Sequence, residues 1–310
     1  MQDNKIVVVG SMNMDHVINC RRLPRPGETI AGQKFSTHSG GKGANQAAAA
    51  GQLGGTPLFI GARGDDDTGL NLQDHLQNMG VNTDLKFSEE NTGTAHIFVT
   101  DDGENHIVII AGANDTLSPE DIRDKKDSLE RAEVVLLQLE IPLETVVETA
   151  RLAAEAGSEV LLDPAPAREL PVELLENVDY LLPNSQELSQ LAPDMAGEDA
   201  DDLERIRHLQ KQGVRNVLLT RGEEGALLVG ENERYEIEAL EVETVDTTAA
   251  GDAFAGAFAL GLAGGLSPRD AAELGAAYGS AAVTSAGAQS SLLTRQEFIR
   301  FAPDAGRLLP

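Results

Sequence analysis

Short runs of branched apolar residues recur along the chain and indicate buried β-strands. Each run is too short for a complete helix and is rich in Val, Ile and Leu. Because polar residues do not alternate with the apolar ones, we expect both faces of these strands to be covered, as in a parallel sheet. The runs lie at residues 6–9, 134–139, 160–162, 180–182 and 217–219.

Segments with helical spacing of apolar residues lie between these runs. A strand followed by a helix, repeated along the chain, predicts an α/β fold with a mostly parallel central sheet flanked by helices. The whole chain, residues 1–310, fits one large domain of this kind. The predicted helices cover residues 44–53, 68–79, 143–156, 203–212, 254–262 and 270–285.

Two stretches interrupt the alternation, at about residues 13–35 and 93–111. The first contains Pro24, Pro26 and Gly27, and the second holds two β-rich runs joined by turn-forming residues at 101–103. Strands without an intervening helix do not easily join a parallel sheet. We therefore expect a small antiparallel β lid over one edge of the domain.

The chain carries a large negative charge. Lys and Arg number 24 and Asp and Glu number 51, which gives a net charge of −27 and a pI near 4.4. A field of this sign repels nucleic acid and anionic membranes, so neither is expected as a partner. The acidity fits either a solubility device or an adaptation to salt, and the sequence leaves both open.

Cysteine content and the lengths of the apolar runs indicate a cytoplasmic protein. The single Cys20 excludes an internal disulfide and a zinc site built from several cysteines. The first ten residues show no apolar segment behind a basic stretch. The longest apolar runs are far below the roughly 18 residues that a membrane helix needs.

The most informative motif is the stretch at residues 245–254, which leads into the apolar helical run. If Ala249, Ala250 and Gly251 form the first helical turn, their backbone N–H groups are free to bind an anion such as a phosphoryl group. Asp252 would lie beside that group, where a carboxylate can accept a proton from an attacking hydroxyl. The alternative is that Asp252 only caps the helix and stabilises it by roughly 0.5 to 2 kcal/mol.

A second glycine cluster occupies residues 39–46 and also precedes a helix of small residues. It does not match a Walker A loop, which would need glycine at Ser36 and a hydroxyl side chain at Gly43. The glycine backbone, together with Lys42 and Asn45, could instead bind a polyhydroxylated ligand. A tight turn between strand and helix is the alternative.

Polar residues follow several predicted strands at the point where each strand ends. Ligands of open α/β sheets bind beyond the carboxyl ends of the strands, so we expect these residues to line a site. Any one of them could be a cap or a turn residue, but they share the same placement. They are Asn13 and Asp15, Glu140, Asn184 and Glu187, and Thr220 with Gly222 and Gly225.

Several signatures of other enzyme classes are absent from the sequence. The dinucleotide fingerprint G-x-G-x-x-G does not follow the first strand, and no G-x-S-x-G elbow is present. The six histidines lack the close spacing of zinc ligands. These observations argue against an oxidoreductase, a serine hydrolase and a structural zinc site.

Two motifs together resemble the signatures of ribokinase-like (PfkB-type) carbohydrate kinases. They are Gly-Gly-Lys-Gly-Ala-Asn-Gln at residues 40–46 and Asp-Thr-Thr-Ala-Ala-Gly-Asp at residues 246–252. Within that family the likeness to ribokinases extends over about residues 6–301 and includes motifs at residues 13–16, 24–28, 163–167 and 287–289. The resemblance implies a three-layer sandwich with a β lid. It also implies ATP-dependent phosphorylation of D-ribose at O5, giving D-ribose 5-phosphate and ADP.

The resemblance also implies a role for each matching position. Asp252 is then the general base, and the backbone of Ala249, Ala250 and Gly251 is the anion hole. The implied sugar ligands are Asn13, Asp15, Gly41, Lys42, Asn45, Glu140 and Asp252. The implied nucleotide site consists of Asn184, Thr220, Gly222, Gly225, Ala250, Gly251 and Ala276.

Two cations are implied by the same resemblance. Glu187 belongs to the family's N-x-x-E motif, which is associated with Mg²⁺ through water. A monovalent cation, normally K⁺, is expected beside the anion hole, where it would hold the loop before Gly251 in position. The matching positions are Asp246, Thr248, Ala282, Ser285, Gly287 and Ser291.

Three residues depart from the family's pattern. Arg221 stands where an apolar residue is frequent, Ala276 where some members carry a histidine near the adenine, and Ser290 where proline is frequent. They affect the expected nucleotide preference and cation affinity and leave the sugar and catalytic positions intact. Because the lid of the family often pairs with its copy, the resemblance implies a homodimer.

Other functions on a similar scaffold stay open at this point. A kinase for deoxyribose, fructose or adenosine would share the catalytic residues, and Asn13 and Asp15 would discriminate among the hydroxyl groups of these substrates. A non-catalytic sugar-binding regulator is a further alternative, against which Asp252 and the anion hole argue. A dinucleotide-dependent oxidoreductase is kept only because many folds share the alternation of strands and helices.

Overall fold

A computed structural model of the chain describes residues 5–192 and 201–310. Within these residues a nine-stranded main sheet has the order β13-β12-β11-β10-β9-β8-β1-β4-β5. Neighbouring strands are parallel except in the β11–β12 and β12–β13 pairs, which are antiparallel. The strands are β1 (Ile6–Val9), β4 (Leu58–Gly64), β5 (Asn82–Ser88), β8 (Val134–Leu137), β9 (Glu159–Leu162), β10 (Tyr180–Leu181), β11 (Asn216–Thr220), β12 (Ala226–Val229) and β13 (Arg234–Ile237).

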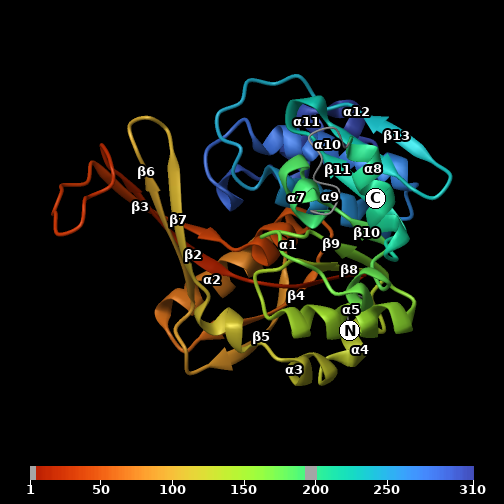
Figure 1. Ribbon diagram of the computed structural model, residues 1–310, viewed down its shortest axis with the longest axis horizontal. Helices are drawn as coiled ribbons and strands as arrows, with labels where there is room; N and C mark the ends of the chain where they lie inside the picture. The colour runs from red at the N-terminus through yellow and green to blue at the C-terminus, as the bar shows by residue number, and fades with distance from the viewer. Residues whose placement is uncertain (1–4, 193–200) are drawn as a thin grey trace.

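Helices cover both faces of the main sheet (Figure 1). One face carries α1 (Lys42–Gln52), α2 (Asp67–Asn78), α9 (Ala250–Ala263), α10 (Pro268–Ala282), α11 (Arg295–Phe301) and α12 (Pro303–Gly306). The other face carries α3 (Pro119–Arg123), α4 (Lys126–Leu129), α5 (Leu143–Ala156), α6 (Val172–Leu175), α7 (Ser185–Leu191) and α8 (Asp202–Lys211). Short 3-10 helices are η1 (Gly112–Thr116), η3 (Gly222–Glu224) and η4 (Gln289–Ser291).

The apolar runs of the central strands explain these two layers. In β1, Ile6 and Val8 pack into the cluster on the side of α9, whereas Val7 and Val9 pack into the cluster on the side of α5. Successive side chains of a strand point to opposite faces, so a strand covered on both sides needs a continuous apolar run. The predicted α/β fold with a mostly parallel sheet is confirmed.

Small residues allow α1 and α9 to pack closely. Residues 47–50 of α1 are alanines without solvent exposure. A Cβ at Gly256 of α9 would lie only 2.4 Å from the carbonyl oxygen of Gln46. This close approach brings the first turn of α9 beside the polar side chains of α1.

A second, smaller sheet has the strand order β3-β2-β6-β7 and projects from the main body (Figure 1). It consists of β2 (Asn13–Asn19), β3 (Lys34–Gly40), β6 (Gly93–Val99) and β7 (Asn105–Ile110). The β2–β3 and β6–β7 pairs are antiparallel, as predicted, and the central β2–β6 pair is parallel. The parallel pair arises because β2 and β6 follow β1 and β5, which run in the same direction. The structure also places β3 later than the predicted stretch, up to Gly40.

Candidate active site

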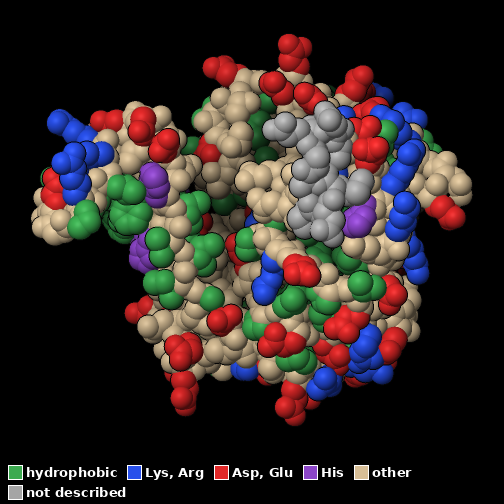
Figure 2. Space-filling view, viewed as in Figure 1, with side chains coloured by type: hydrophobic (Ala, Val, Ile, Leu, Met, Phe, Trp, Pro, Cys, Tyr) green, Lys and Arg blue, Asp and Glu red, His purple; other side chains and the backbone are tan. Residues whose placement is uncertain are grey.

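Polar residues from several strand ends meet in cavities at one side of the main sheet. Figure 2 shows the surface hollowed between the small sheet and the main body. The first cavity encloses about 630 Å³ beside Lys42 and Asp252, and the second, about 1230 Å³, adjoins it at Thr220 and Gly251. The third, about 1060 Å³, lies beside Asn13 and Glu140. All three are open to solvent.

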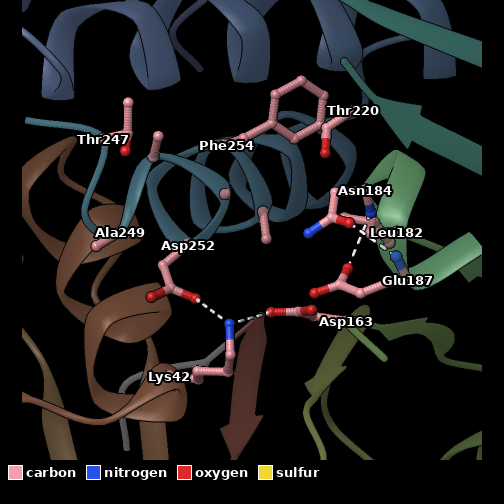
Figure 3. A pocket seen from close by; sticks show the side chains of 13 residues that line it. Lys42, Asp163, Leu182, Asn184, Glu187, Thr220, Thr247, Ala249, Asp252 and Phe254 are labelled. Carbon is pink, nitrogen blue, oxygen red and sulfur yellow. Dashed lines mark hydrogen bonds and ion pairs between the residues drawn. The ribbon is translucent and has the colours of Figure 1, made fainter. Parts of the chain in front are cut away.

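Lys42 lies between two carboxylates in the first cavity (Figure 3). Its Nζ is 3.5 Å from Asp163 Oδ2 and 3.8 Å from Asp252 Oδ1. Burial lowers the pKa of Lys42, but Asp163 and Asp252 outweigh this effect and raise the pKa above its ordinary value, so the amine is charged. Burial raises the pKa of Asp163 above its ordinary value despite the charge of Lys42.

Asp252 is fixed by two amide donors of α1. Asn45 Nδ2 donates to Oδ2 at 2.9 Å, and Gln46 Nε2 donates to Oδ1 at 3.0 Å. The same Gln46 amide donates to Asp163 Oδ2 at 2.7 Å, and its Oε1 accepts a hydrogen bond from Gln138 Nε2 at 2.5 Å. Only 5% of Asp252 is exposed. The carboxylate therefore holds one orientation at the wall of the cavity.

The first turn of α9 presents N–H groups to the same cavity. Ala249 precedes the helix with φ of 59°, a left-handed conformation that is uncommon for a residue with a side chain and recurs at functional sites. The N–H group of Ala250 donates to the Thr247 carbonyl at 3.2 Å, so this predicted member of the anion hole is engaged in a turn. Among the described residues, the N–H groups of Gly251 and Asp252 have no hydrogen-bond partner.

Two glycines let the end of β3 and the turn that follows it lie close to the start of β2 at the predicted sugar site. A Cβ at Gly40 would lie 2.2 Å from Asp15 Oδ2, and one at Gly41 would lie 2.6 Å from the Cα of Met12. The φ of Gly41 is 90°, which also favours glycine. The glycine cluster is therefore a tight turn between β3 and α1, and the same turn brings Lys42 to the cavity.

Of the other predicted sugar ligands, Asn13 and Glu140 line the third cavity, whereas Asp15 and Asn45 are not among the residues that line the three cavities. Asn13 and Asp15 are two positions apart on β2 and share one face of the strand. Glu140 Oε2 accepts hydrogen bonds from Ser11 Oγ at 2.6 Å and from the N–H group of Lys42 at 3.1 Å. Asn45 Oδ1 accepts a hydrogen bond from Gln289 Nε2 at 3.0 Å, and Asn45 Nδ2 donates one hydrogen to Asp252, so the other amide hydrogen is left for a ligand.

The pKa of Asp15 is raised to about 7, first by burial and then by the negative charges of Glu140 and Asp252. A carboxyl group with a raised pKa in the folded state destabilises the fold progressively as the pH rises from its unfolded value near 4 to about 7. We expect the Asp15→Asn variant without ligand to gain stability over the native protein across this range, with a constant gain above about pH 7. Thermal melts of both proteins at pH 4.5, 6, 7 and 8 check this, and a gain independent of pH would contradict it.

The predicted nucleotide ligands line the second cavity and its junction with the first. Thr220, Gly222, Gly225, Ala250, Gly251 and Ala276 all line the second cavity. Asn184 and Glu187 line the first, and they also cap α7, since Asn184 Oδ1 accepts from the Glu187 N–H at 2.8 Å and Glu187 Oε2 accepts from the Asn184 N–H at 2.9 Å. Arg221 is paired with Glu236 of β13 and is not among the lining residues.

The segments that carry the predicted K⁺ positions meet beside the first turn of α9. Asp246 Oδ2 accepts from the Gly287 N–H at 2.8 Å, and Oδ1 accepts from the Thr248 N–H at 2.9 Å. Burial raises the pKa of Asp246, but the hydrogen bonds from Thr248 and Gly287 outweigh it and hold the pKa below its ordinary value. Ala282 is the last residue of α10, Ser285 lies on the connection from α10 to η4, and Ser291 is the last residue of η4. Among the described residues, no group of three or more His, Cys, Asp or Glu side chains could hold a metal ion.

Sequence reasoning gave no role to three side chains of this network. Gln46 lies four residues after Lys42, and this helical spacing could have placed both on one face. Asp163 follows a predicted strand directly, as the other site residues do. Gln138 carried no signal, because it lies inside an apolar run that was predicted to be a strand throughout.

The pattern of the pfkB family of carbohydrate kinases matches residues 3–295, nearly the whole chain. The chain belongs to this family. The expectation from the two glycine-containing motifs is thereby confirmed. Membership of a kinase family also removes the ground for a dinucleotide-dependent oxidoreductase.

This pfkB kinase is similar to ribokinases and deoxyribokinases over most of its length. It is 37% identical to the ribokinase of Haemophilus influenzae over 298 residues, which cover 96% of this chain and 97% of that protein. It is also 37% identical to the deoxyribokinase of Salmonella typhimurium, with 94% and 97% covered. The solved structure of Arabidopsis thaliana ribokinase complexed with ribose and ATP has a TM-score of 0.89 at 34% identity, with 96% and 98% covered.

Proposed function

We propose that this chain is a ribokinase, which transfers the γ-phosphoryl group of ATP to O5 of D-ribose and releases ADP. The observation that carries the proposal is the pairing of a fixed, buried carboxylate, Asp252, with the unpartnered N–H groups at the first turn of α9. The carboxylate would accept the hydroxyl proton, and the N–H groups would bind phosphoryl oxygens. Similarity to ribokinases over nearly the whole chain supports ribose as the sugar.

The sugar would lie between the third cavity and Asp252. Asn13, Asp15 and Glu140 would bind hydroxyl groups there, with Gly41 and the free N–H group of Asn45 at the side of α1. The charged amine of Lys42 lies 3.8 Å from Asp252 Oδ1 and would offset negative charge as the phosphoryl group is transferred. We therefore assign Lys42 to the transferred group as well as to the sugar.

The nucleotide would occupy the second cavity. Thr220, Gly222, Gly225 and Ala276 would line the nucleoside, and Asn184 would lie near the phosphates. Glu187 would hold Mg²⁺ through water, since one edge of its carboxylate stays free of the α7 cap and lines the first cavity. When bound, Mg²⁺ supplies positive charge to the phosphate oxygens.

A monovalent cation, normally K⁺, would bind beside Asp246. An ionised, half-buried carboxylate near the carbonyl groups of the connection from α10 to η4 fits such an ion. Asp246, Thr248 and Gly287 would hold it with Ala282, Ser285 and Ser291. Asp246 already accepts hydrogen bonds from Thr248 and from Gly287. These bonds join the connection from α10 to η4 to the loop that carries Ala249.

A kinase for 2-deoxyribose is the second candidate function. The specific observation in its favour is that the deoxyribokinase of Salmonella typhimurium is as similar in sequence, at 37% identity, as the ribokinase of Haemophilus influenzae. The two candidates share every catalytic residue. They differ in whether the site reads the 2-hydroxyl group.

The deciding experiment is ADP release from Mg·ATP with ribose, 2-deoxyribose, fructose or adenosine, each with K⁺ and with Na⁺ only. We expect a K⁺-dependent preference for ribose and phosphate on O5 of the product. Preference for another substrate would keep the catalytic assignment and overturn the specificity. Equal rates in both salts would overturn the cation site, and no turnover with any of the four would favour a sugar-binding regulator.

We also propose a homodimer through the small sheet and a cytoplasmic location. The edge strand β7 exposes four consecutive apolar residues, Ile107 to Ile110, by 50% to 57%, which leaves apolar surface on both faces of the strand. A monomer mass in light scattering at micromolar concentration would contradict the dimer.

The proposed cytoplasmic location is supported by the buried, unpaired Cys20, which fits a reducing compartment. No helix in the described ranges is long and apolar enough to cross a membrane.

A further inference from the structure

Asn114 of η1 reaches across to β2 and contacts the predicted sugar ligand Asn13. Its Nδ2 donates to Asn13 Oδ1 at 2.8 Å. It also bonds both backbone groups of Met12, since Oδ1 accepts from the N–H at 3.0 Å and Nδ2 donates to the carbonyl at 3.2 Å. Only 1% of Asn114 is exposed, and both asparagines line the third cavity. No motif in the sequence pointed to this residue.

The backbone of Met12 determines the orientation of both amides. An N–H group only donates and a carbonyl group only accepts, so Oδ1 of Asn114 must face the Met12 N–H and its Nδ2 the Met12 carbonyl. The second hydrogen of that Nδ2 then points to Asn13, whose Oδ1 must accept it. Asn13 consequently turns its own NH₂ group away from Asn114.

Gly93 of β6 packs directly against the two amides. A Cβ at Gly93, the partner of Asn13 on β6, would lie 2.3 Å from both Asn114 Nδ2 and Asn13 Oδ1. The absence of a side chain at Gly93 therefore leaves room for the amide pair. Rotation of the Asn13 amide is therefore opposed by the fixed donor of Asn114 on one side.

We infer that Asn114 is a positioning residue for sugar selection, which holds Asn13 as a hydrogen-bond donor toward the cavity. Asp15, two residues along the same face of β2, offers oxygen atoms that accept. A sugar hydroxyl group that binds both Asn13 and Asp15 would accept a hydrogen bond from the Asn13 amide and donate one to the Asp15 carboxyl group. A sugar without that hydroxyl group would leave these two side chains unpaired. This inference rests on the proposed sugar kinase function and adds a residue to it.

The test measures kcat and KM for ribose and for its 2-deoxy and 3-deoxy analogues in native and Asn114→Ala proteins. Without Asn114 the Asn13 amide can rotate, so we expect the KM for ribose to rise roughly tenfold, as for one lost hydrogen bond. The KM for the analogue that lacks the shared hydroxyl group should stay nearly unchanged, and so should kcat for ribose. An unchanged preference for ribose over both analogues would overturn the inference.

A matched control separates orientation from stability. Thr116→Val removes a hydrogen bond of the same 3-10 helix, from Thr116 Oγ1 to the Ala113 carbonyl at 2.8 Å, without touching Asn13. Its sugar preference should equal that of the native protein. In an Asn13→Ala background, Asn114→Ala should add little to the KM for ribose, because the group that it orients is gone.

A second variant covers the case in which Asn114→Ala does not fold. Asn13→Asp keeps an oxygen for the bond from Asn114 and replaces only the donor that faces the cavity. Ribose binding, measured by calorimetry, should weaken by tenfold or more, and native affinity would overturn the proposed orientation. If the native protein neither binds nor phosphorylates ribose, the proposed function is wrong. If the native protein is active and the variants have the same ribose affinity and KM as the native protein, only the proposed role of Asn114 is wrong.

Discussion

Replacement of Asp252 by asparagine is expected to lower kcat with ribose by about 10²- to 10⁴-fold while ribose still binds. The asparagine has nearly the same shape, but its amide cannot take the proton from the sugar hydroxyl. Rates at saturating sugar, compared with ribose binding by calorimetry, separate the two effects. An unimpaired kcat would refute the assignment of Asp252 as the general base.

The same substitution also has a structural cost that must be measured. The native carboxylate accepts from two donors, Asn45 and Gln46. An asparagine at position 252 turns an N–H group toward one of them, so we expect the free energy of unfolding to fall by about 1–3 kcal/mol. Rates should therefore be compared well below the melting temperature of the variant.

Asp270→Asn is the matched control, because Asp270 is a carboxylate that only stabilises the start of its helix. Asp270 lies in the first turn of α10, as Asp252 does in α9, and accepts a hydrogen bond from Ser267 Oγ at 2.7 Å. We expect a small loss of stability and no change in kcat. If both variants lost only stability, the capping interpretation of Asp252 would be the correct one.

The sequence does not predict strand β4, and the structure shows why. β4 is fully buried, but Gly61, Arg63 and Gly64 interrupt its apolar pattern. Arg63 is tolerated there because it donates to the Gly64 carbonyl and to Gln73 and lies over the ring of Phe87, 4.4 Å from its centre. A satisfied buried cation of this kind depends on partners that only the fold supplies.

The signals that predict residues of the site are local. A polar residue after a strand and small residues before a helix can be read from neighbouring positions. The bonds that fix Asp252 join residues 206 and 207 positions apart, and the bond from Gln46 to Asp163 spans 117. The raised pKa of Asp15 likewise depends on burial by distant segments and on Glu140 and Asp252. No local pattern contains this information.

Two interpretations that the sequence set against each other hold together in the structure. Asn184 and Glu187 form the capping box of α7 and also line the first cavity. Residues 40–43 form a tight turn and also deliver Lys42 to the carboxylates. A turn or cap at the end of a strand is where the backbone leaves the sheet, so its residues lie at the edge where ligands bind.

The backbone of Gly251 offers the sharpest test of the anion site. A Cβ at this position would meet nothing within 4 Å, so the fold has room for a side chain and the first cavity occupies that room. In Gly251→Ala the methyl group would lie where the phosphoryl group must approach the N–H groups. We expect kcat to fall by about 10²-fold, the usual effect of displacing a reacting group by about 1 Å. The melting temperature should be equal or higher, since alanine favours a helix.

Gly256→Ala makes the same change on the same helix and is expected to do the opposite. Its Cβ would lie 2.4 Å from the Gln46 carbonyl oxygen, so α1 and α9 would have to separate and the melting temperature should fall. The comparison of kcat and melting temperature in the two variants distinguishes a blocked phosphoryl site from a disturbed helix. If Gly251→Ala kept the native kcat, the phosphoryl group would not approach the first turn of α9, and the anion hole would have to be placed elsewhere in the cavities.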